Sequence, residues 1–102
     1  MIIGKYDLPC QYDTRQNFYG KAKIEIVKYN NFIAYILYSY GTEVASIEKY
    51  NNLIIYYYNG KYSQTTTRHQ KEFFRQEGLT EKEIQELFKN GRLEKQVDLI
   101  WD

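Results

Sequence analysis

The sequence predicts an α+β domain in which a four-stranded antiparallel meander is followed by two helices packed on the sheet. The first observation is the alternation of apolar and polar side chains across residues 21–58, which is typical of strands. The second is a pair of related segments in this region, each with a turn signal at its centre. The third is the change, after Gly60, to the three- and four-residue spacing of amphipathic helices.

The related segments start 21 residues apart, at Ile26 and Ile47, and seven of their ten positions are identical. Each contains an Asn-Asn pair, and asparagine tolerates the positive φ angles of tight turns. Each segment therefore predicts a strand, a turn and a second strand. Chance similarity in a chain rich in Tyr, Asn, Lys and Ile is the alternative.

The sheet is expected over residues 21–59. Its two predicted hairpins pair residues 21–29 with 32–40 and residues 43–49 with 53–58. The strand that begins at Phe32 is apolar on both faces, so we expect it to be central in the sheet.

Residues 1–20 are expected to form an N-terminal arm. Met1–Ile3 could add a short edge strand, and Pro9 ends any regular element before it. Cys10 follows in a loop. Nothing beside it in the sequence would clearly lower the pKa of the thiol, so we expect a free thiol that packs against the domain.

The first helix is predicted over residues 64–77, with Thr65 or Thr67 as its N-cap and Gly78 as the residue that ends it. The second helix is predicted over residues 80–90.

The two sides of the first helix differ in chemistry. At about 100° per residue, Phe73 and Phe74 share one side and are the expected core anchors. Arg68, Lys71 and Arg75 gather on the opposite side. This cationic side is the most distinctive candidate for a binding surface.

The first turn of this helix contains Arg68 and His69, although the helix dipole disfavours cations there. One interpretation is an anion site, in which these side chains and free backbone N–H groups hold phosphate or carboxylate. The other is structural: Arg68 pairs with Glu72, and His69 packs over Phe73, because both pairs have i,i+4 spacing.

The second helix has the clearest local signals. Thr80 and Glu83 have the spacing of a capping box, and Asn90-Gly91 ends the helix. Residues 92–102 form a tail. Its apolar segment Val97–Trp101 is strand-like, and we expect it to dock on the sheet edge or on a partner.

Composition restricts the class of protein. A chain of 102 residues with a formal net charge of +1 predicts one domain, and it argues against a strongly basic nucleic-acid binder and an acidic DNA mimic. We expect a soluble cytoplasmic protein, because no leader and no apolar run of membrane-spanning length occurs. The 12 tyrosines suit a protein interface, but also strands in general.

The sequence contains no recognisable catalytic or metal-binding motif. His69 is the only histidine and Cys10 the only cysteine. A dyad of these two residues is conceivable, but no third group that would orient it is identifiable. We therefore predict no catalytic residues, no metal and no cofactor.

Three segments between residues 12 and 76 carry a family resemblance. They are Tyr12-Asp13 with Phe18-Tyr19-Gly20-Lys21-Ala22, Tyr29-Asn30-Asn31-x-Ile33-Ala34-Tyr35, and Tyr62-Ser63-x-Thr65-Thr66-x-Arg68-His69-x-x-Glu72-Phe73. These segments resemble small uncharacterised proteins from phages and plasmids of low-GC Gram-positive bacteria. The resemblance implies a mobile-element context and no activity.

Two functional hypotheses follow. The first is a non-enzymatic protein-binding inhibitor or adaptor, directed at a host defence system such as a CRISPR effector nuclease. The alternative is a small nucleic-acid-binding module that stacks bases on sheet tyrosines and contacts phosphates with the basic helix side. The partner-binding residues expected under these hypotheses are Lys61, Arg68, His69, Lys71 and Arg75, with Tyr56, Tyr58 and Tyr62.

Overall fold

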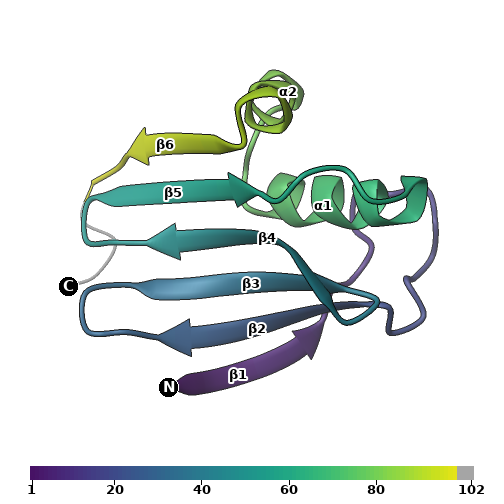
Figure 1. Ribbon diagram of the computed structural model, residues 1–102, viewed down its shortest axis with the longest axis horizontal. Helices are drawn as coiled ribbons and strands as arrows, with labels where there is room; N and C mark the ends of the chain where they lie inside the picture. Colours follow the sequence, from purple (N-terminus) through teal and green to yellow (C-terminus); the bar gives the residue numbers. More distant parts are fainter. Residues whose placement is uncertain (99–102) are drawn as a thin grey trace.

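The structure is a computed structural model, and it describes residues 1–98. Six strands form one open antiparallel sheet in the order β1-β2-β3-β4-β5-β6 (Figure 1). The strands are β1 (Ile2–Asp7), β2 (Ala22–Lys28), β3 (Ile33–Ser39), β4 (Thr42–Lys49), β5 (Leu53–Tyr58) and β6 (Arg92–Gln96). The helices α1 (Gln64–Gln76) and α2 (Glu81–Asn90) lie between β5 and β6 in the chain.

The four predicted central strands and their antiparallel order are confirmed as β2 to β5. The predicted number of strands is too small, because the arm contributes β1 and the tail contributes β6 at the two edges. The side chains of both outer strands are mostly exposed. The hydrophobic alternation that identifies a half-buried strand is therefore weak there, and backbone pairing defines these strands.

The tail pairs through an earlier segment than predicted. Arg92–Gln96 forms the edge strand, and Val97 N donates to Asn52 O at 3.1 Å just beyond it. The residues after Asp98 lie outside the described part of the chain, so the structure does not test that part of the strand-like segment.

The two related segments form equivalent hairpins. Tyr29 N donates to Phe32 O at 2.9 Å in the first turn, and Tyr50 N donates to Leu53 O at 2.8 Å in the second. The Asn-Asn pairs do not have the positive φ angles that we expected of them. In the sheet, positive φ angles occur instead at Tyr40 and Gly41, in the turn between β3 and β4.

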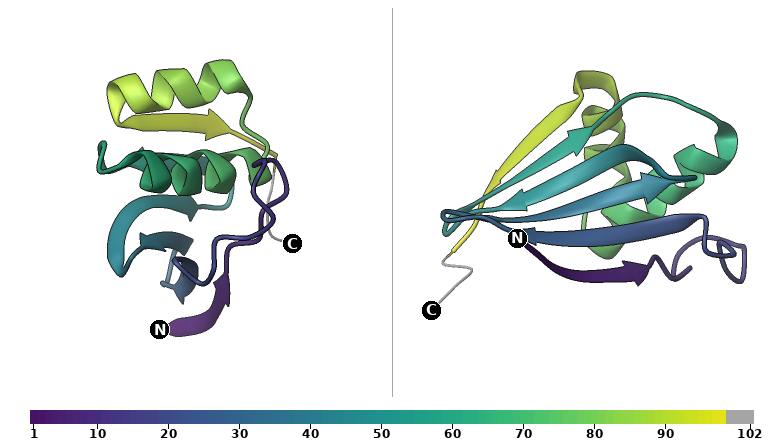
Figure 2. Two further views of the ribbon diagram at one scale, coloured as in Figure 1. Left: turned by 90° about the vertical axis from the view of Figure 1, so that its right-hand side faces the viewer. Right: turned by 60° about the horizontal axis from the view of Figure 1, so that its bottom comes forward.

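Both helices cover the same face of the sheet (Figure 2). α1 contributes Phe73 and Phe74 to the core, and α2 contributes Ile84 and Leu87. The sheet side of this core is made by Ala22, Ile24, Leu37, Ala45, Ile47 and Tyr56. None of the helices within residues 1–98 is long and apolar enough to cross a membrane.

The ends of the helices follow local chemistry. The N-cap of α1 is Ser63, whose Oγ accepts from Thr66 N at 3.1 Å. The predicted caps, Thr65 and Thr67, are therefore wrong, because both residues lie inside the helix. Four hydroxyl residues lie within the five positions 63–67, so the sequence did not distinguish which of them caps the helix. The predicted capping box at the start of α2 is confirmed, as is the C-terminal Gly91, which has φ 81°.

A candidate binding surface on helix α1 and the N-terminal loop

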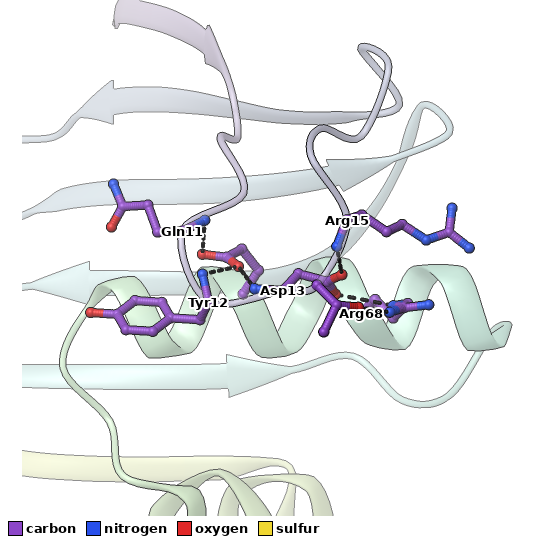
Figure 3. Close-up of polar contacts among 7 residues, drawn as sticks. Gln11, Tyr12, Asp13, Arg15 and Arg68 are labelled. Atoms are coloured by element: carbon purple, nitrogen blue, oxygen red, sulfur yellow. Dashed lines mark hydrogen bonds and ion pairs between the residues drawn. The ribbon is translucent and has the colours of Figure 1, made fainter.

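The loop between β1 and β2 is fastened to α1 by Glu72. This carboxylate accepts backbone N–H bonds from Gln11 at 3.2 Å, Tyr12 at 2.9 Å and Asp13 at 2.8 Å (Figure 3). Gln76, one turn later, donates its side-chain amide to the same carboxylate. Glu72 is 2% exposed, and these donors replace the water that its charge loses on burial.

Asp13 in turn binds α1 through Arg68. The guanidinium Nε lies 3.0 Å from Asp13 Oδ2, and Nη2 lies 3.0 Å from Thr14 Oγ1. Burial acts to raise the pKa of Asp13, but hydrogen bonds from Arg15 N and from Arg68 outweigh it and hold the pKa below its ordinary value. The expected Arg68–Glu72 pair is therefore wrong, because each residue is bound to the loop instead.

A cavity of about 320 Å³ lies where the loop, α1 and α2 meet. Arg75 lines this cavity and contacts both the loop and α2. Its guanidinium lies 5.4 Å from the centre of the Tyr12 ring, and its Nη1 lies 3.1 Å from Glu81 Oε2. The complete lining is Tyr12, Asp13, Arg68, Lys71, Glu72, Arg75, Glu81 and Ile84. A second hollow along α1 is lined by Lys61, Gln64, Thr67, Arg68 and Lys71.

On α1 and the segment that leads into it, Lys61 and Lys71 are exposed cations with no ion-pair partner among residues 1–98. By contrast, Arg68 and Arg75 are held by carboxylates. Lys71 lines both hollows, so they form one cationic surface along α1. We call this the α1 surface, formed by Lys61, Tyr62, Arg68, Lys71 and Arg75 of α1 and its approach, with Tyr12 from the loop.

Residues 6–90 match one family model, described as "Family of unknown function (DUF8033)". The chain belongs to this family. The region shared with DUF8033 contains the loop, α1 and the whole α1 surface, and it ends before β6. Neither the curated proteins nor the solved structures contain a match to the chain.

His69 does not contribute to the surface of this DUF8033 domain, because it is 1% exposed. Its Nδ1 lies 2.8 Å from Ser39 Oγ, and its ring packs between Phe18, at 4.5 Å between ring centres, and Tyr40, at 5.8 Å. Burial, aided by the charge of Arg15, lowers the pKa of His69. We expected His69 to bind a partner, or to pack over Phe73. Both expectations are wrong, because the ring is buried and packs against Phe18 and Tyr40.

The structure also separates the three predicted tyrosines. Tyr62 is exposed, whereas Tyr56 is 2% exposed and sits against Phe74 in the core. Tyr58 stacks on Phe88 of α2, with 4.1 Å between ring centres. Tyr56 and Tyr58 belong to the face that the helices cover, so the expected sheet platform of these tyrosines is wrong.

Sequence reasoning missed Tyr12 and Arg15. Figure 3 shows the Arg15 side chain extending away from Asp13, although its backbone N–H donates to that carboxylate at 2.9 Å. The sequence did contain one signal for this loop contact, which is the position of Glu72 beside the apolar side of the helix. A carboxylate that is buried there needs hydrogen-bond donors from another part of the chain. Its position alone does not say which segment supplies them.

The structure also places the other candidate ligands. Within residues 1–98, no group of three His, Cys, Asp or Glu side chains is arranged to hold a metal ion. Cys10 is a free thiol that packs against the core, as expected. Burial, with the nearby charges of Asp13 and Glu72, raises the pKa of this thiol.

Proposed function

We propose that this DUF8033 protein is a non-enzymatic binding protein whose α1 surface docks on an acidic surface of a partner protein. The observation that carries the proposal is the exposure of Lys61 and Lys71 with no acidic partner in the described chain, beside the exposed rings of Tyr12 and Tyr62. Exposed tyrosine next to unneutralised cations is typical of protein interfaces that use charge to orient a partner.

The mixed charge of this surface favours a protein partner over nucleic acid. Asp13 and Glu81 line the same cavity as the cations, and their carboxylates would repel a phosphate backbone. The alternative nucleic-acid function requires stacking rings beside the basic side of the helix. Since Tyr56 and Tyr58 pack under the helices, Tyr62 and Tyr12 are the rings left there for bases.

The partner that we propose is a component of a host defence system, such as a CRISPR effector nuclease. The resemblance to small phage and plasmid proteins supports this choice. The α1 surface supports it independently, because nucleases carry acidic sites and a small protein can block such a site with fixed cations. The loop bonds to Glu72 and Arg68 supply the rigidity that lowers the entropic cost of binding.

The test compares two charge-reversal variants. Lys61→Glu with Lys71→Glu reverses the α1 surface, and Lys82→Glu with Lys89→Glu reverses two exposed lysines on α2 as a matched control. The tagged wild-type protein is first used to capture partners from a host lysate with and without nuclease treatment. The captured protein is then purified and titrated against both variants.

We expect the α1 variant to bind more than about tenfold more weakly and the α2 variant to bind like the wild type. Equal weakening by the two variants would contradict a specific α1 surface. Loss of capture after nuclease treatment, with a steep dependence of affinity on salt, would establish the nucleic-acid alternative instead.

A further inference from the structure

Two turns at one end of the sheet share an uncommon sequence. One turn leads into β2 and the other joins β3 to β4, and their central residues are Tyr19-Gly20 and Tyr40-Gly41. All four residues have positive φ angles, which are 53° and 72° in the first turn and 52° and 82° in the second. The turns are neighbours at the end of the sheet where α1 begins (Figure 1), because Tyr40 N donates to Lys21 O at 2.8 Å.

Tyrosine is an unfavourable residue for the first of these two central positions. Turns with positive φ at both positions are dominated by glycine, asparagine and aspartate, because a bulky side chain is strained there. Neither tyrosine is buried, since Tyr19 is 77% exposed and Tyr40 is 58% exposed. The Tyr40 ring does stack on His69, with 5.8 Å between ring centres. Strain that packing offsets so little is typical of residues that bind a ligand.

A hollow of about 360 Å³ lies against the two turns and has cationic and aromatic walls. Lys21 lines it and has no ion-pair partner within residues 1–98. Lys23 lies 2.8 Å from Asp7, but this pair is exposed to solvent and therefore weak, so another anion can compete for the lysine. The described residues of the lining are Gly20, Lys21, Lys23, Tyr38, Tyr40 and Gly41, and none of these is acidic.

We propose that Tyr19, Lys21, Lys23 and Tyr40, here called the Tyr-Gly surface, bind single-stranded nucleic acid. The exposed tyrosine rings can stack on unpaired bases, and the two lysines can bind the phosphates that join those bases. Nothing lies within 4 Å of the position that a side-chain carbon would take at Gly20 or at Gly41, so the space beside both turns is open. A single strand is the preferred ligand, because a duplex hides the faces of its bases.

The Tyr-Gly surface is separate from the protein-docking α1 surface, and the two share no residue. The carboxylates of Asp13 and Glu81 stand among the cations of the α1 cavity, whereas the described lining of this hollow contains no acid. The formal net charge of +1 does not oppose the proposal. Exposed charges are screened beyond about 8 Å at physiological salt, so the residues nearest the phosphates decide the local attraction.

The test is a fluorescence anisotropy titration of a short labelled oligothymidylate with the full chain. A strand of the same length that lacks its bases measures binding to phosphate alone. We expect the oligothymidylate to bind at least about fivefold more tightly than the strand without bases, because each stacked base adds affinity. An oligouridylate of equal length shows whether DNA or RNA is preferred. Equal binding with and without bases, or no saturation up to about 1 mM protein, would overturn the proposal.

Tyr19→Asn tests the stacking without endangering the fold. Asparagine is a residue that this kind of turn prefers, so the melting temperature should stay the same or rise. We expect the oligothymidylate to bind this variant about fivefold more weakly. Tyr62→Asn, at an exposed position of the α1 surface, is the matched control and should bind like the wild type. Weaker binding by Tyr62→Asn alone would place the strand on the α1 surface and would contradict the assignment.

Lys21→Gln tests the phosphate contact. One lost contact to a single strand should make the slope of log K against log salt concentration shallower by about 0.7. Lys82→Gln, which removes an exposed lysine of α2, is the control and should leave the slope unchanged. The same slope in the wild type and in Lys21→Gln would show that the phosphates do not lie in this hollow, and the proposed site would be wrong.

Discussion

The carboxylate of Glu72 on α1 holds the backbone N–H of Asp13 at 2.8 Å, although the two residues are 59 positions apart in the sequence. Through this contact a helix that packs on the sheet also determines where the N-terminal loop lies. The loop then brings Tyr12 to Arg75 and Asp13 to Arg68. The α1 surface is thus assembled from two segments that are fastened by one buried acid.

Replacing this acid should loosen the loop. Glu72→Gln places an amide N–H₂ group where three backbone donors converge, so at least one buried donor loses its acceptor. We expect the free energy of unfolding to fall by about 2–3 kcal/mol, as measured by urea denaturation. Glu86→Gln, on the exposed side of α2, is the control and should change it by less than about 0.5 kcal/mol. A similar small change for Glu72→Gln would show that the carboxylate does not hold the loop.

The cations of the α1 surface should differ in their effect on stability. Arg68→Glu sets a new carboxylate against Asp13, and we expect it to lower the free energy of unfolding by about 1 kcal/mol, because Arg68 is partly screened by solvent. Lys71→Glu should leave the melting temperature unchanged, since Lys71 is exposed and has no acidic partner in the described chain. Thermal melts of the two single variants measure this difference. Equal melting temperatures would contradict the role of the Arg68–Asp13 pair.

Stability should fall as the pH drops from 7 to 5 because of His69. Its pKa in the folded protein lies below the ordinary value of 6.5, so the unfolded chain takes up the proton first as the pH falls. The charged groups that act on the ring are Arg15, which opposes protonation, and Asp13, which favours it. The expected slope is measured by urea denaturation at several pH values.

His69→Gln provides the comparison, because glutamine can still bond to Ser39 but does not titrate. We expect this variant to be less stable at neutral pH and to lose the slope between pH 7 and 5. Asp13 and Glu83 have pKa values lowered below 3.8 and 4.5, so their contributions disappear only at lower pH. A slope that persists in the variant would assign the pH dependence to another group.

The two phenylalanines of α1 should carry much of the stability. Phe73 and Phe74 are 3% and 0% exposed, and we expect alanine at either position to cost about 3–5 kcal/mol in the free energy of unfolding. Tyr62→Ala removes an aromatic ring from an exposed position and should cost less than about 0.5 kcal/mol. A loss under about 1 kcal/mol for Phe73→Ala would place this side chain outside the core.

The sequence by itself determined the elements whose signals are local. The alternation in β2 to β5, the repeated hairpin and the capping box of Thr80 with Glu83 depend on residues that are a few positions apart. Hydrogen bonds and side-chain periodicity act over this range, so the residue types suffice to identify them. The cationic side of α1 was visible for the same reason.

Only the tertiary structure decided which side chains remain on the surface and how they are paired. His69 and Tyr56 are buried by segments distant in sequence, and Arg68 is bound by Asp13, 55 positions away. Glu48 lies between Ala34 of β3 and Ile55 of β5 because the register of the three strands brings these residues side by side. Such contacts depend on how the chain closes its loops and aligns its strands, and no spacing along the sequence records that alignment.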